Sequence, residues 1–157
     1  MKNWKLQKVD HALTNKLANE LNVSKYIAKL LILRGVNSFI AAKNFFRPDL
    51  KNVHDPFLMK GMKDAVNRIN RAKSQNESVL LFGDYDVDGT SAVSMMYTFF
   101  KDQNINVNYY VPDRYSEGYG FSKQAIDYAF NQKDSLIITL DCGIRAVQQT
   151  AYANSKN

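Results

Sequence analysis

The sequence has very little cysteine and histidine: one Cys, Cys142, and two His among 157 residues. A single thiol cannot form an internal disulfide, and a chain without disulfides fits a reducing compartment. The N-terminus has no apolar stretch of the kind found in signal peptides. No apolar run approaches the roughly 20 residues that cross a bilayer. These absences predict a cytoplasmic protein with no membrane partner.

The composition is that of a folded chain, with 45% hydrophobic and 12% aromatic residues. The length suits one ordinary domain or a small domain with an appendage. Residues 1–77 carry 15 Lys and Arg against 6 Asp and Glu, whereas residues 78–157 carry 6 against 9. A basic half beside an acidic half suits a polyanionic substrate. A solvated lysine-rich surface explains the same charges equally well, so charge alone does not decide between the two.

The first 77 residues are predicted to be helical. Apolar residues recur at helical spacing in segments 24–35, 38–46 and 62–72. Ser24 and Ser38 are expected to cap the first two helices, which should end at Gly35 and before Pro48. Residues 1–77 are therefore predicted to form a basic, helical N-terminal region.

From residue 78 onward, short apolar strands alternate with helical segments. The strands are predicted at residues 79–82, 107–111 and 135–140, and the helices at residues 90–101, 123–131 and 145–153. This alternation predicts an α/β fold over residues 78–157, with βαβ units and a parallel sheet. The carboxyl ends of all three strands then lie at one edge, where such folds bind ligands. Three strands make a small sheet, so we expect a truncated part of a longer protein.

Three aspartates, Asp84, Asp86 and Asp88, occupy every second position directly after the first predicted strand. Anions this close repel one another, and a bound cation is the usual way to keep them ionised together. Asp141 follows the third strand and would meet them if the strand order is 2-1-3. All-oxygen ligands fit Mn²⁺ or Mg²⁺, and two such ions can promote phosphodiester hydrolysis. The sequence therefore predicts a hydrolytic metal site.

Other interpretations of residues 84–90 fit less well. An EF-hand loop would place a glutamate where Met95 lies, and a P-loop would need a lysine after Gly89. Residues 86–90 match the Asp-x-Asp-Gly-Thr signature of haloacid dehalogenase phosphatases, with Asp86 as nucleophile. In that family the nucleophile follows the strand directly, which Asp86 does not. Asp88 could alternatively cap a helix that begins at Thr90.

Two segments, residues 83–90 and 140–144, resemble motifs of the DHH phosphoesterases. Three others, residues 30–35, 54–59 and 111–120, are similar to the branch of that superfamily formed by single-strand-specific DNA exonucleases. The resemblance implies a Mn²⁺-dependent exonuclease that degrades single-stranded DNA from the 5′ end in recombination and repair. It also implies a DHH-type α/β phosphoesterase domain over residues 78–157.

The resemblance also implies roles for individual residues. Asp84, Asp86, Asp88 and Asp141 would be catalytic, and the last three of these would bind metal, with two ions in the complete enzyme. The residues expected near the substrate are Arg114, Gly118, Tyr119 and Gly120. Cys142 follows a ligand directly but has no evident base nearby, so we interpret it as a packing residue.

One part of the family pattern is missing from the sequence. The Asp-His-His motif is absent, and neither His11 nor His54 has a matching context. We expect the missing C-terminal portion of the same enzyme to supply that motif, and this chain alone to have little nuclease activity. The alternative function is a phosphatase or pyrophosphatase for small substrates, of the DHH or haloacid dehalogenase type.

Overall fold

The computed structural model describes residue 3 and residues 5–156, and its contacts divide the chain into two compact units. In the sequence, the first unit ends at Leu58 and the second begins at Met59. Within the described residues, no helix has both the length and the apolar character needed to cross a membrane.

The N-terminal unit is a small helical cluster. Its elements are α1 (His11–Leu21), α2 (Lys25–Leu33), α3 (Phe39–Phe46) and two short 3-10 helices, η1 (Leu50–Asn52) and η2 (Pro56–Leu58). Ser24 and Ser38 accept N–H bonds from the first turns of α2 and α3, which confirms both predicted caps. Leu17 and Ala18 of α1 pack against Ala28 and Leu31 of α2 to form the core of this unit.

Helix α1 was not predicted, although its sequence carries a signal. Asp10 caps it by accepting N–H bonds from Ala12 and Leu13. Leu13, Leu17 and Leu21 then follow at four-residue spacing, the pattern of an apolar helix face.

The second unit contains the predicted parallel sheet, with three strands in the order β2-β1-β3, which is the order under which Asp141 was expected to meet the aspartate run. Its elements are α4 (Met62–Ser74), β1 (Val79–Gly83), α5 (Val87–Asp102), β2 (Val107–Tyr110), α6 (Lys123–Asn131), β3 (Leu136–Leu140) and α7 (Val147–Asn154). The alternation of strand and helix confirms the α/β prediction.

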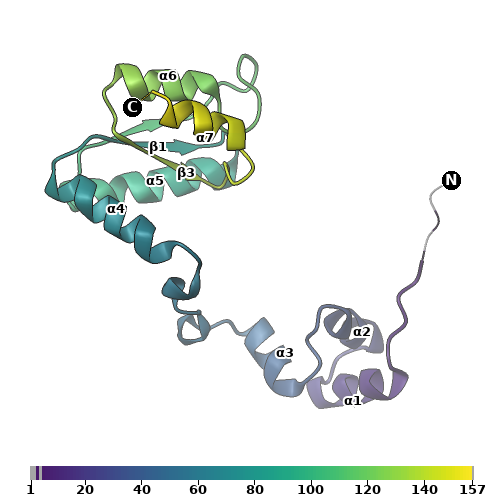
Figure 1. Cartoon of the computed structure of the whole chain (residues 1–157). Coiled ribbons are helices and arrows are strands. Elements are labelled where there is room, and N and C mark those ends of the chain that lie inside the picture. The colour runs from purple at the N-terminus through teal and green to yellow at the C-terminus, as the bar shows by residue number, and fades with distance from the viewer. Residues whose placement is uncertain (1–2, 4, 157) are drawn as a thin grey trace. The chain divides into compact units, whose positions relative to one another are not determined.

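Helices cover both faces of the sheet (Figure 1). Val79 and Leu81 of β1 lie in one apolar cluster with Val93 of α5 and Ala72 of α4. Phe82 lies in the cluster on the other face, which α6 and α7 cover. Because β1 is central and covered on both faces, all five of its residues are buried.

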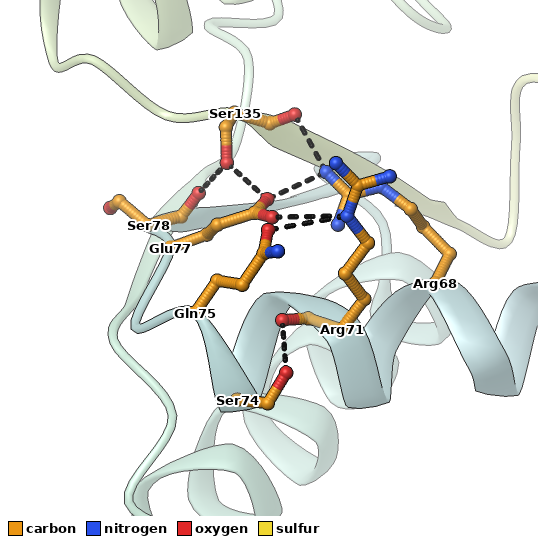
Figure 2. A network of polar contacts seen from close by, with 7 residues as sticks. All are labelled: Arg68, Arg71, Ser74, Gln75, Glu77, Ser78 and Ser135. Carbon is orange, nitrogen blue, oxygen red and sulfur yellow. Dashed lines mark hydrogen bonds and ion pairs between the residues drawn. The ribbon is translucent and has the colours of Figure 1, made fainter.

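A polar network ties α4 to the sheet at the amino ends of the strands (Figure 2). Glu77 accepts a bond of 2.7 Å from Arg68 and one of 2.6 Å from the hydroxyl of Ser135. Arg68 also donates to the carbonyl of Ser135. These contacts, and the packing of Ala72, place α4 in the unit that contains the sheet. The division of the structure therefore falls 19 residues before the boundary predicted at residue 78.

Candidate metal centre at the carboxyl edge of the sheet

The three strands end at the same level of the sheet. In the parallel register, Phe82 of β1 lies beside Tyr110 of β2, and Gly83 lies beside Leu140 of β3. Asp84 and Asp141 therefore follow neighbouring strands at corresponding positions. The loop after β2 begins at the same edge, so segments far apart in sequence share one site.

Helix α5 begins at Val87, inside the aspartate run and three residues earlier than predicted. Asp86 is its N-cap, because its Oδ1 accepts the N–H of Gly89 at 2.9 Å. Asp88 lies exposed in the first turn, where a carboxylate interacts favourably with the helix dipole. The interpretation of Asp88 as the cap of a helix beginning at Thr90 was wrong.

Two glycines let α5 begin this close to β1. A Cβ on Gly89 would lie 2.4 Å from the carbonyl oxygen and 2.6 Å from the nitrogen of Asp84. A Cβ on Gly83 would lie 2.4 Å from a methyl group of Val93. Any larger residue at either position would push the first turn of α5 away from the end of the strand.

Asp84 is the one buried carboxylate among the described residues. Its Oδ1 accepts the N–H of Tyr85 at 2.8 Å, and its Oδ2 accepts the N–H of Gly120 at 2.9 Å. Both oxygens are thus engaged by backbone donors, which offset the cost of burying a charge. Asp84 links the end of β1 to the loop after β2, and so supports the site rather than facing solvent.

The loop between β2 and α6 is shaped by two further carboxylates. Glu117 accepts bonds from the Tyr110 hydroxyl, the Asp113 amide and the Ser122 hydroxyl. Burial raises the pKa of Glu117, but these three bonds outweigh that effect and leave its pKa below the usual value. Asp113 accepts the amides of Tyr115 and Ser116, and the bonds from Ser116 lower its pKa most.

The sequence interpretation did not single out Glu117 or Asp113. Asp113 carries a local signal, because an Asp that accepts amides two and three residues ahead is typical of turns. The partners of Glu117 lie in β2, the loop and the start of α6, so its role becomes visible only in the fold.

Aromatic and basic side chains lie beside this edge. The rings of Tyr85 and Tyr119 meet edge to face at 5.9 Å, and the Arg114 guanidinium lies 5.4 Å from the centre of the Tyr85 ring. Tyr119 is 68% exposed. Gly118 and Gly120, on either side of it, both have positive φ. Of the residues predicted to contact substrate, the fold therefore brings Arg114, Tyr119 and Gly120 to the aspartates.

The aspartates of the site contribute to raised pKa values at two neighbouring groups, Tyr119 and Cys142. Asp86, then Asp84, and more weakly Asp141, raise the pKa of the Tyr119 phenol. Burial, followed by Asp84 and Asp141, raises the pKa of the Cys142 thiol to about 11. This thiol also packs against the cluster around Phe82, and at neutral pH it stays protonated.

Asp141 adopts a left-handed backbone conformation, with φ of 57°. Aspartate tolerates this region better than most residues, but it still costs about 1 kcal/mol or more. Two residues further along, a Cβ on Gly143 would lie 2.5 Å from the Thr139 hydroxyl, so the turn after β3 packs closely against the end of that strand. A strained aspartate at a strand end is typical of a functional site.

The predicted ligand set is not assembled within the described residues. Across residue 3 and residues 5–156, no three His, Cys, Asp or Glu side chains lie close enough to hold one ion. The individual donors nevertheless fit a hard divalent cation. Asp86 uses only Oδ1 for its cap, and Asp88 and Asp141 are exposed carboxylates at the same edge. The assignment of Asp86, Asp88 and Asp141 as ligands stays a prediction.

Comparison with known proteins identifies the class of this fold and site. Residues 78–157 match the DHH family, N-terminal domain. This match covers the sheet, the aspartate run and Asp141. The chain belongs to the DHH family, which decides against the haloacid dehalogenase interpretation.

Within that family, the chain is similar to the single-stranded-DNA-specific exonuclease RecJ. It is 38% identical to the Bacillus subtilis protein over 150 residues, which is 96% of this chain and 19% of that protein. The Escherichia coli protein is 29% identical over 98 residues, or 62% of this chain and 17% of that protein. The chain thus spans about a fifth of the length of these relatives.

Two solved structures have a similar fold. A crystal structure of exonuclease RecJ bound to manganese matches 62% of this chain and 25% of that chain, with a TM-score of 0.57 and 25% identity. RecJ from Thermus thermophilus, in complex with Mn²⁺, matches 92% of this chain and 19% of that chain. Its TM-score is 0.63, and at 21% identity it bears on the fold alone.

Proposed function

We propose that this chain provides the strand-end carboxylates of a metal-dependent exonuclease that degrades single-stranded DNA from the 5′ end. A C-terminal portion of the same enzyme would supply the rest of the metal centre, and the enzyme would act in the cytoplasm. The observation that carries the proposal is that Asp84 and Asp141 follow neighbouring parallel strands at corresponding positions, and that Asp86 caps the helix that begins at the same edge. The similarity to manganese-bound RecJ supports the choice of metal.

Each carboxylate has a separate task in this proposal. Asp86, Asp88 and Asp141 would hold Mn²⁺ or Mg²⁺, two ions in the complete enzyme, which would polarise the phosphodiester and activate water. Asp84 fixes the ligand-bearing turn to the loop after β2 through its bonds to Tyr85 and Gly120.

The loop after β2 would position the substrate. Arg114 offers a planar guanidinium whose geometry suits a phosphate, and its position over Tyr85 limits its freedom. The Tyr119 phenol is protonated at neutral pH and can donate a hydrogen bond, and Asp86 and Asp84 raise its pKa further. Glu117 keeps the loop in the shape that presents both residues.

The ligand set within the described residues is incomplete, so we expect the isolated chain to hydrolyse DNA very slowly. The function is therefore tested in a chimera, in which residues 1–157 replace the matching part of the Bacillus subtilis RecJ protein. We expect the chimera to degrade a single-stranded oligonucleotide in Mn²⁺ and to leave the corresponding duplex intact. The end from which labelled nucleotides are released tests the proposed direction.

Matched variants of the chimera test the site itself. Asp86→Asn and Asp141→Asn should each lower the rate by at least about 100-fold, because each removes an anionic metal ligand. Asp102→Asn, at the other end of α5, makes the same chemical change and should leave the rate unchanged. Equal rates for Asp86→Asn and Asp102→Asn would refute the proposal, provided that circular dichroism shows both to be folded.

A further inference from the structure

The N-terminal unit contains a hollow that the metal site does not use. It has a volume of about 380 Å³ and is lined by Leu21, Phe39, Lys43, Phe46 and Arg47. We call it the basic-aromatic hollow. Its lining combines two phenyl rings and two cations, with no acidic side chain.

The hollow is a consequence of how α3 is built. Phe39, Lys43 and Phe46 are spaced at i, i+4 and i+7, which places them along one face of the helix. Ala42, three residues after Phe39 and four before Phe46, lies beside this row and is completely buried. Arg47 continues the row at the end of the helix, where its amide bonds the carbonyl of Lys43 at 2.9 Å.

The two rings of the hollow are about half exposed. Phe39 is 49% exposed and Phe46 is 53% exposed, although their unit has its own core around Leu17 and Leu31. Exposed aromatic side chains grouped in one place are typical of binding surfaces. The adjacent cations determine which kind of ligand suits this surface.

The charge of the unit favours a polyanion. Residues 1–58 contain 10 Lys and Arg against 4 Asp and Glu, a net charge of +6 that equals the charge of the whole chain. Residues 59–157 contain 11 of each sign and are neutral. A positive field of this kind raises the local concentration of anionic ligands and speeds their association.

We propose that the basic-aromatic hollow binds single-stranded nucleic acid. An unpaired base stacks on the Phe46 ring, with Phe39 beside it, while Lys43 and Arg47 contact the flanking phosphates. Proteins bind single strands by this combination of aromatic platforms and cations, because every base has a face that can stack. A duplex hides those faces, and an apolar protein segment would leave both cations without partners.

This site is separate from the metal centre in the sequence and in its side chains, although both would bind single-stranded DNA. It lies outside the residues that match the DHH family, and it needs no metal. Binding is therefore measured in EDTA with the whole 157-residue chain and a fluorescent 12-nucleotide oligo(dT). A failure here leaves the chimera experiment untouched, and the reverse also holds.

The aromatic part of the proposal is tested with a matched pair of variants. Phe46→Leu keeps an apolar side chain but removes the ring, and it should weaken oligonucleotide binding about tenfold. Phe57→Leu makes the same change at another phenylalanine of this unit, which is 49% exposed and does not line the hollow. It should leave the affinity unchanged, and neither variant should alter the binding of polyphosphate, which has no bases.

The ionic part is tested by salt dependence. Replacing Lys43 and Arg47 with glutamine should make the slope of log K against log salt shallower by about 1.4, as two lost single-strand phosphate contacts predict. The control replaces Lys16 and Lys51, two exposed lysines of the same unit that do not line the hollow. Its slope should stay close to that of the unchanged chain.

Three results would overturn the proposal. The first is equal oligonucleotide affinity for Phe46→Leu and Phe57→Leu when circular dichroism shows both to be folded. The second is binding of a duplex as tight as that of the single strand. The third is a dimer, seen by sedimentation, that Phe46→Leu alone dissociates, because the hollow would then bind a second copy of the chain.

Discussion

At the scale of single residues, the glycines of the aspartate run are as informative as its carboxylates. Gly83 and Gly89 allow α5 to start against the end of β1, and this close approach makes Asp86 the cap of the helix. Asp84 and Asp86 then receive different environments although they are two residues apart. Asp84 is buried and bonded by two amides, whereas Asp86 keeps one oxygen outside its cap.

Gly89→Ala should therefore destabilise the protein. The added Cβ would overlap the backbone of Asp84, and overpacking of this kind costs about 1–3 kcal/mol. Ser91→Ala places an alanine at an exposed position of the same helix and should change the free energy of unfolding little. Urea unfolding followed by circular dichroism measures both. Unchanged stability in Gly89→Ala would show that the close approach is not required.

Cys142 offers a second test at this scale. Its pKa is raised from 9.0 to about 11, so the folded protein contains about 100-fold less thiolate at pH 8 than a thiol with the unshifted value. The thiolate is the reactive form. We expect iodoacetamide to alkylate the folded, metal-free protein about 100-fold more slowly than the protein unfolded in urea. Equal rates would contradict the protonated, packed state described for this residue.

At the scale of elements, the loop between β2 and α6 is held by carboxylates that must be ionised. The pKa of Glu117 lies below its usual value of 4.5, so its stabilising contribution is present above that pH. The contribution is lost as the pH falls through the lowered value. The Gly120 amide lies in this loop and donates to Asp84 at the end of β1, so its protection from hydrogen exchange reports whether the loop keeps its shape.

Hydrogen exchange measured by NMR should show a protected Gly120 amide from pH 6 to pH 8, after correction for intrinsic exchange. Protection should fall on acidification below pH 4.5. Glu117→Gln should reduce the protection already at neutral pH, because the amide accepts less strongly than the carboxylate and carries no charge. Glu20→Gln, in α1, is the control and should leave Gly120 protected. The same protection in Glu117→Gln as in the unchanged chain would refute the role of Glu117.

At the scale of the whole molecule, the parallel sheet and the edge that carries the aspartates were predictable from the sequence, whereas the 2-1-3 strand order entered only as a condition. The alternation of apolar runs and helices, together with the handedness of parallel connections, restricts the topology strongly. Helix α6 was predicted with its observed bounds, whereas α5 began early because a cap at Asp86 competes with one at Asp88. Local propensity does not decide between two such caps, but the tight contact of Gly89 with Asp84 does.

The contacts that support the site could not be predicted. Glu117 draws its partners from three separate segments, and Arg68 and Glu77 join α4 to the sheet. Such pairings depend on the tertiary fold rather than on periodicity. For the same reason, the sequence placed α4 with the basic N-terminal region, whereas its apolar side packs against the sheet.

The central claim is that the carboxyl edge of this sheet carries metal ligands, and a Mn²⁺ titration of the 157-residue chain tests it most directly. Electron paramagnetic resonance reports the free ion, whose signal falls as it binds. We predict that Asp86→Asn and Asp141→Asn each weaken binding at least about tenfold, and that Asp102→Asn does not. Equal affinity in all three variants and the unchanged chain would contradict the account.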